Sequence, residues 1–100
     1  MKITGFIWLE KIIQKLIWKH SVTVEEVREL FLNSPRYHFV EKGDRKDENV
    51  YSAQGQTDEG RYLICYFIHK ADKQALVLKQ ALVLSARDMT SSEKKRYGRK

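Results

Sequence analysis

The spacing of apolar residues changes from a helical period to a strand period at Pro35, the one proline of the chain. Before it, apolar residues recur every three to four positions, which predicts an amphipathic helix over about 10–19 and a second helix that begins after Thr23. Proline ends the second helix, because the residue before a proline is pushed out of the helical region. Beyond it, apolar and polar residues alternate, which predicts strands. The order of elements therefore indicates an α+β fold with two N-terminal helices.

The second half of the chain is expected to form an antiparallel β-meander followed by a short C-terminal helix. Gly60 is expected to adopt a positive φ in a tight turn at 57–60, and Gly55 to weaken or bulge its strand. The continuous apolar run 62–68 predicts a central strand covered on both faces. Strands are expected at 36–41, 50–56, 61–70 and 75–86, after a brief strand or extended arm near 3–8.

A six-residue duplication precedes the end of the last expected strand. Lys73–Leu78 is repeated letter for letter as Lys79–Leu84. Because six is even, such an insertion keeps the alternation of inward and outward side chains. We expect the second copy to pair with the central strand and the first copy to lengthen the hairpin. An unpaired first copy exposes an apolar edge, so a homodimer contact through residues 73–84 is expected.

The length and composition limit the class of protein. One hundred residues with 42% hydrophobic residues suffice for one packed core, so a single domain over 1–100 is expected. The apolar run 62–68 is too short for a membrane helix, and no signal-peptide pattern is seen, so a soluble cytoplasmic protein is expected. A single cysteine excludes a disulfide framework and a thiolate zinc site. No cofactor or metal is expected.

The net charge of +6 is unevenly distributed along the chain. Residues 21–60 are acidic, and the segments on either side of them are basic. If the two basic ends fold together, they form a positive surface that attracts RNA or DNA. Two alternatives stay open, because the charge can serve solubility alone and the acidic middle can face a basic partner protein.

The residue types favour RNA chemistry without a metal ion. The sequence has no glycine-rich phosphate loop, no closely spaced histidine pair and no Cys-x-x-Cys motif. A base can accept the 2′-OH proton, an acid can protonate the leaving oxygen, and Arg or Lys can stabilise the charged phosphorane. The candidate catalytic residues are His20, Arg61, Arg87 and Glu93. Each also has a structural explanation: a helix end for the histidine, solvated strand ends for the arginines, and a capping box with Thr90 for the glutamate.

Two basic segments are candidates for binding the RNA backbone. Lysines one turn apart form a stripe on the first helix, and further basic residues surround a tyrosine near the C-terminus. The candidate RNA-binding residues are Lys11, Lys15, Lys19, Lys94, Lys95, Arg96 and Tyr97. The alternatives are a solvated helix face and a frayed chain end.

An ordered set of short motifs runs through nearly the whole chain. It comprises an early Trp8, Lys19-His20 followed by Val22, the run Gly60-Arg61-Tyr62, and Ser85-Ala86-Arg87 followed by Glu93 and Tyr97. This set resembles the BrnT toxin family. The resemblance implies a RelE-like fold, endoribonuclease activity on cellular RNA that inhibits translation, and a BrnA-like ribbon-helix-helix antitoxin as partner.

From the charge pattern and the resemblance together, we expect Lys19, His20, Arg61 and Arg87 to lie in one cleft. Three functions remain open at this point. The protein is a toxin ribonuclease, an inactive relative that only binds the antitoxin, or a basic nucleic-acid-binding domain.

Overall fold

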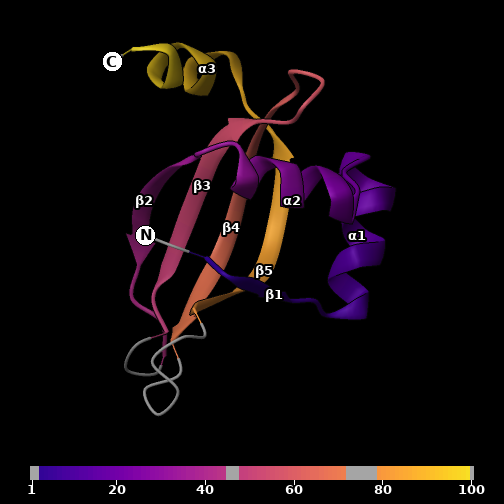
Figure 1. The fold of residues 1–100 in the computed structure, drawn as a ribbon, viewed down its shortest axis with the longest axis vertical. Helices are drawn as coiled ribbons and strands as arrows, with labels where there is room; N and C mark the ends of the chain where they lie inside the picture. Colours follow the sequence, from indigo (N-terminus) through magenta and orange to yellow (C-terminus); the bar gives the residue numbers. More distant parts are fainter. Residues whose placement is uncertain (1–2, 45–47, 72–78, 100) are drawn as a thin grey trace.

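Five strands and three helices are present among the described residues. The computed structural model describes residues 3–44, 48–71 and 79–99. In chain order the elements are β1 (Gly5–Ile7), α1 (Glu10–His20), α2 (Val24–Leu32), β2 (Arg36–Glu41), β3 (Val50–Gln56), β4 (Tyr62–Ala71), β5 (Lys79–Asp88) and α3 (Ser91–Gly98), as Figure 1 shows.

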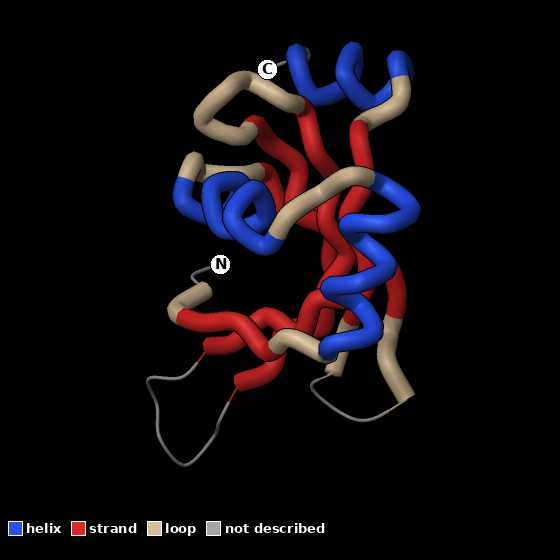
Figure 2. The backbone as a smooth tube through the Cα atoms, turned by 90° about the vertical axis from the view of Figure 1, so that its right-hand side faces the viewer, coloured by secondary structure: helices blue, strands red, loops and turns tan. Residues whose placement is uncertain are grey.

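The strands form one sheet in the order β1-β5-β4-β3-β2. Neighbours from β2 to β5 pair antiparallel, whereas β1 pairs parallel with β5. The expected α+β fold, with two early helices, a meander and a short C-terminal helix, is confirmed. The N-terminal arm adds a fifth strand, which makes the sheet mixed. Figure 2 shows α3 at one end of the molecule, apart from α1 and α2.

The two N-terminal helices pack on one face of the sheet, α1 mainly against β5 and α2 against β3. We call the opposite face of the sheet the open face. Burial of apolar side chains between helices and sheet supplies most of the stability of such a fold. The cluster between them includes Leu16, Val22, Val27, Leu30, Leu63, Cys65 and Phe67.

Successive side chains of β4 alternate between the two faces. Leu63, Cys65 and Phe67 face the helices and are fully buried, whereas His69, further along the strand, is half-buried. On the open face, Ile64 is buried but Tyr66 and Ile68 are only half-buried. The central strand is thus fully covered on one face and partly covered on the other, which falls short of the expected cover on both faces.

The local sequence signals for helix starts and turns are confirmed. Thr23 with Glu26 and Thr90 with Glu93 both form capping boxes, in which hydroxyl and carboxylate satisfy amides of the first turn. Gly60 has a φ of 88° in the hairpin turn. Among the described residues no helix is long and apolar enough to cross a membrane.

The second copy of the duplication holds the pairing with the central strand, as expected. Leu82 pairs with Ile68 and Val83 with Phe67. Residues 80–82 pair with β1 on their other side, so this part of β5 is no free edge. The expected homodimer contact cannot use the backbone of residues 80–82. The first copy, residues 73–78, lies outside the described residues.

Of the two outcomes expected at Gly55, a weakened strand or a bulge, the bulge is wrong. β3 pairs with β4 without a register shift, and Gly55 lies opposite Leu63. A Cβ atom at position 55 would lie 2.9 Å from Leu30 Cδ1 and 3.5 Å from the Pro35 Cα. The glycine therefore allows α2 to pack closely on the strand. The shifts in the sheet lie elsewhere, between Phe39 and Glu41 and opposite Tyr66–Phe67.

We expect Gly55→Ala to destabilise the protein by about 1–3 kcal/mol, the usual cost of overpacking a core. The new methyl group would press on Leu30, which has no exposed surface to move into. Urea unfolding monitored by circular dichroism measures the change. Gly98→Ala is the matched control, because no atom lies within 4 Å of the added Cβ there. Equal stability of the two variants would contradict this account.

Candidate nucleic-acid interface

The four candidate catalytic residues lie at one end of the sheet but on both of its sides. Arg87 and Asp88 are consecutive in β5, so their side chains project to opposite faces. Asp88 binds Arg61 on the side of the helices, whereas Arg87 contacts Tyr66 on the open face. The expectation of one cleft that contains both arginines is wrong. This separation could not be predicted from the sequence, because Arg61 lies just before β4 and the direction of its side chain depends on the conformation of the turn.

Arg61 connects three elements through one guanidinium group. Nε and Nη2 donate to the two carboxylate oxygens of Asp88 at 2.7 and 3.1 Å. Nη1 donates to the Glu26 carboxylate at 3.1 Å and to the carbonyl oxygen of Ser21 at 2.7 Å. Nη2 also donates to the carbonyl oxygen of His20 at 2.9 Å. The side chain thus ties the end of β5 to the start of α2 and the end of α1.

These contacts use all five N–H groups that an arginine offers. The hydrogen bond to Arg61 lowers the pKa of Asp88, and Coulomb attraction from Lys94 and His20 adds to the effect. The same pairing raises the pKa of Arg61. With its donors engaged, Arg61 stabilises the fold and has none left for a phosphate. His20 lies beside this network, on the side of the sheet away from Arg87.

Arg87 forms the centre of a second cluster, on the open face. Nη1 and Nη2 donate to the two carboxylate oxygens of Glu93 at 2.7 and 3.1 Å. Nη2 also donates to the Tyr66 hydroxyl at 3.2 Å, and Nη1 to the Asp88 carbonyl oxygen. The hydrogen bond from Arg87, together with those from Thr90, lowers the pKa of Glu93 to about 2. Glu93 is therefore ionised at neutral pH and holds Arg87 in place.

Cations and aromatic rings are paired along this end of the open face. Tyr62 and Tyr66 project from β4, and Tyr97 of α3 packs edge-to-face on Tyr62. Each tyrosine ring carries a cation within 6 Å, the range of a cation–π contact. The pairs are Arg36 with Tyr97 at 4.9 Å, Lys94 with Tyr62 at 5.6 Å and Arg87 with Tyr66 at 5.8 Å.

A polar hollow of about 620 Å³ borders this row of rings. Its lining consists of Asn33, Gln56, Thr57, Asp58, Gly60 and Tyr97. Amide and carboxylate groups of this kind form hydrogen bonds with sugars and bases rather than with apolar ligands. The hollow thus lies at the end of the sheet, between the C-terminus of α2, the hairpin turn and Tyr97 of α3.

The candidate RNA-binding residues fall into two separate groups. Lys94 and Tyr97 join the open face, and Lys95 and Arg96 are exposed on α3. Lys11, Lys15 and Lys19 are exposed on α1, on the opposite side of the sheet. The two basic ends of the chain therefore form two surfaces rather than one.

Sequence reasoning missed Tyr66 and Arg36 on the open face, and Trp18 on α1. Tyr66 could have been predicted from the alternation of side chains along a strand, because residues 62, 64 and 66 share one face of β4. Arg36 needed the register of β2 against β3, which the loop between them does not reveal. Trp18 could have been noticed at helical spacing from Lys11 and Lys15.

No protein-family model matches the chain, and no curated protein matches its sequence. Within residues 3–44, 48–71 and 79–99, no three His, Cys, Asp or Glu side chains gather as metal ligands.

We expect Arg61→Ala to lower the free energy of unfolding by about 2–3 kcal/mol, because it leaves Asp88 and Glu26 without their partner. Arg28→Ala is the matched control, since Arg28 pairs with Glu25 on the same helix. That pair is 50% and 73% exposed, against 26% and 25% for Arg61 and Glu26, so its loss costs under about 1 kcal/mol. Chemical denaturation of both variants measures the difference, and equal losses would contradict a structural role for Arg61.

The Arg87–Glu93 pair makes stability depend on pH in the acid range. The folded pKa of Glu93 is about 2, below its ordinary 4.5, so the pair stabilises the fold above pH 4.5. This stabilisation is lost as pH falls from 4.5 toward 2 and amounts to about 1–2 kcal/mol, because solvent at Arg87 screens the pair. Glu93→Gln should therefore be less stable than the wild type at pH 6 and equally stable near pH 2. Glu59→Gln, in the exposed hairpin turn, should show no such pH dependence.

Proposed function

We propose that the protein is the toxin of a type II toxin–antitoxin system, a metal-independent endoribonuclease that cleaves cellular RNA and inhibits translation. It acts in the cytoplasm and is neutralised by a BrnA-like ribbon-helix-helix antitoxin. The motif set that resembles the BrnT family supports the reaction class. The single structural observation that carries the proposal is Arg87, oriented by Glu93 and Tyr66 among the aromatic rings of the open face.

The open face has the chemistry that single-stranded RNA requires. Unpaired bases stack on aromatic side chains of a sheet, while cations contact the phosphates between them. Tyr62, Tyr66 and Tyr97 supply rings, and Arg36 and Lys94 supply cations next to them. An RNA strand on this face brings its phosphates to the guanidinium of Arg87.

Arg87 would stabilise the charge that develops on the scissile phosphate. A phosphate and the Glu93 carboxylate both accept bidentate hydrogen bonds from a guanidinium group, so the phosphate takes over contacts that Glu93 makes in the free protein. With a pKa of about 2, Glu93 is a weak base and serves chiefly to position Arg87. The Tyr66 hydroxyl, hydrogen-bonded to Arg87, is the proton-carrying group next to this phosphate.

One observation favours the alternative of a binding module without cleavage. Arg61 is fully engaged in the fold and His20 lies on the other side of the sheet, so neither joins Arg87. An inactive relative would retain the open face and the antitoxin contact but would not cut RNA. Cleavage and binding must therefore be measured separately.

The test compares two substitutions that break the same ion pair. Arg87→Ala should slow the cleavage of single-stranded RNA by purified protein roughly 100- to 1,000-fold, the usual cost of losing one charge-stabilising donor. Glu93→Gln should tighten RNA binding, because it keeps the capping hydrogen bonds and frees the positive charge of Arg87. Gel electrophoresis of labelled RNA follows cleavage, and fluorescence anisotropy follows binding.

Glu25→Gln is the control for net charge, because it also removes one negative charge but lies on α2. It should leave cleavage unchanged and RNA binding nearly so. Full cleavage by Arg87→Ala would refute the proposal. Binding without cleavage by the wild type would replace it with the binding-module alternative. A strong loss of cleavage in Glu93→Gln would instead make Glu93 a catalytic acid or base.

A further inference from the structure

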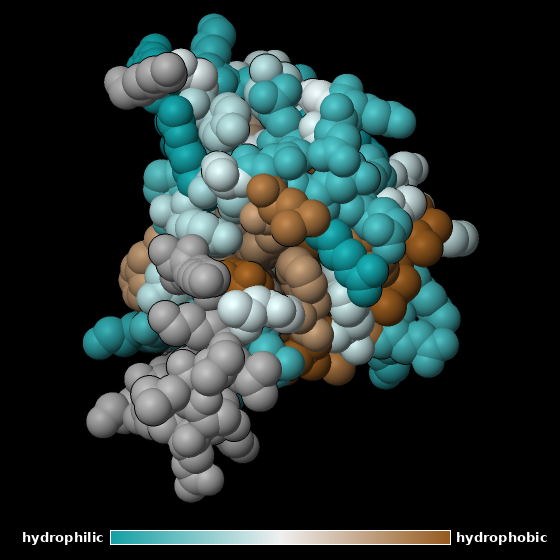
Figure 3. Space-filling view, viewed as in Figure 1, coloured by the Kyte–Doolittle hydropathy of each residue, from teal (hydrophilic) through white to brown (hydrophobic). Residues whose placement is uncertain are grey.

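Trp18 lies on the solvent side of α1 with 93% of its surface exposed. Its neighbour Ile17 is 53% exposed. Large aromatic side chains are on average mostly buried, so an indole in full contact with water contributes almost nothing to this fold. Figure 3 shows hydrophobic atoms among hydrophilic ones at the edge of the molecule where Figure 1 places α1.

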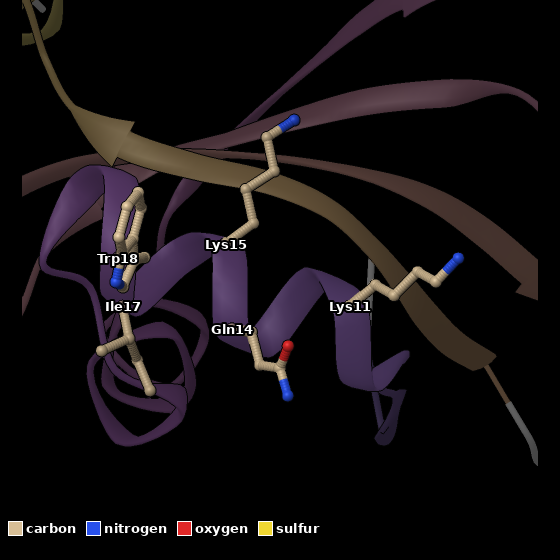
Figure 4. A pocket seen from close by; sticks show the side chains of 5 residues that line it. All are labelled: Lys11, Gln14, Lys15, Ile17 and Trp18. Carbon is tan, nitrogen blue, oxygen red and sulfur yellow. The ribbon is translucent and has the colours of Figure 1, made fainter.

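Basic and amide side chains surround the exposed indole. A shallow hollow of about 570 Å³ is lined by Lys11, Gln14, Lys15, Ile17 and Trp18. Figure 4 shows these five side chains projecting from α1, with the strands of the sheet behind the helix. Four residues of an α-helix rise about 6 Å, so Lys15 lies about one turn from Trp18 along the helix and Lys11 about one turn beyond Lys15. Lys19 follows Lys15 by about one turn, and Glu10 is the one acidic residue of α1.

We propose that this face of α1 is a second contact site for single-stranded RNA, in which one base stacks on Trp18 and Lys11 and Lys15 bind the adjacent phosphates. Stacking on an aromatic ring next to lysines is the usual way in which proteins hold single strands without reading their sequence. The Gln14 amide can both donate and accept hydrogen bonds at a base edge.

The composition of the hollow favours RNA over a protein or a membrane as occupant. Its apolar part consists of two side chains, whereas a stable protein interface has a broad apolar centre within about 800 Å² per partner. A helix that lies on a membrane needs a free apolar face. In α1 that face is turned toward the core, where Leu16 is fully buried. One ring beside two cations matches one nucleotide of a single strand.

The site is independent of Arg87, because α1 covers the other side of the sheet. Only the choice of RNA as the polyanion rests on the proposed function. The two claims can therefore fail separately, since one concerns cleavage at the open face and the other concerns the emission of Trp18.

Intrinsic fluorescence of the full chain tests the inference. The probe is a 2′-O-methylated single-stranded oligoadenylate, which cannot be cleaved by attack of its own 2′ oxygen. We expect it to quench the Trp18 emission, obtained as the difference between the wild type and Trp18→Phe, which both retain Trp8. Arg87→Ala should leave this quenching in place. Trp18→Ala should weaken binding roughly tenfold, and Trp18→Phe less, because phenylalanine still stacks.

The lysines are tested by salt dependence. Replacing Lys11 and Lys15 by alanine should reduce the slope of log affinity against log salt by about 0.7 for each lost phosphate contact. Lys42→Ala, which removes an exposed lysine outside α1, should leave the slope unchanged. Equal quenching by the DNA version supports the inference, because stacking and phosphate contacts are common to both strands.

Three results would overturn it. The first is unchanged Trp18 emission at saturating RNA, and the second is equal RNA affinity of the wild type and Trp18→Ala. The third is a change of Trp18 emission with polyglutamate or with phosphatidylglycerol vesicles but not with RNA, which would assign the surface to an acidic protein or a membrane. Quenching in a protein that never cleaves RNA would leave this site intact and remove the proposed enzymatic function.

Discussion

The arrangement of helices on sheet depends on the guanidinium group of Arg61. It donates hydrogen bonds to two carboxylates and two backbone carbonyl groups at the place where α1 ends, α2 begins and β5 leaves the sheet. The carbonyl groups at the end of a helix lack partners within the helix, and α2 begins only a few residues later. A single planar cation with five donors meets these needs at once. A lysine has three donors around one atom and could not span the same acceptors.

Much of the fold follows from local patterns that the sequence displays directly. The capping boxes, the positive φ of Gly60 and the change of period at Pro35 are all properties of a few adjacent residues. The second copy of the duplication pairs with β4 over residues 79–83, and the register shifts at its last residue, Leu84. Gly55 was misread because a glycine in a strand has two meanings, a bulge or a close neighbour, and only the packing of α2 decides between them.

The candidate site was less predictable because it depends on which way side chains point. Arg61 and Arg87 each follow a recognisable motif, and both lie at the same end of the sheet. The residue after Arg87 is Asp88, and alternation in β5 sends the two to opposite faces. The sequence does not show that Arg61 binds Asp88. The separation of the two arginines therefore could not be predicted from it. The charge pattern likewise identified the two basic ends of the chain, but it could not show that they lie on opposite sides of the sheet.

If the open face binds RNA as proposed above, the pairing of Arg87 with Glu93 makes that binding selective among polyanions. In the free protein the two charges compensate each other, so an incoming phosphate must replace a carboxylate that is already well oriented. A lone phosphate gains little from such an exchange. A strand that also stacks bases on Tyr62, Tyr66 or Tyr97 adds favourable contacts that the carboxylate cannot offer. In the proposed complex, the ion pair would make RNA binding depend on bases and backbone together and would discriminate against simple anions, even though the protein carries a net charge of +6.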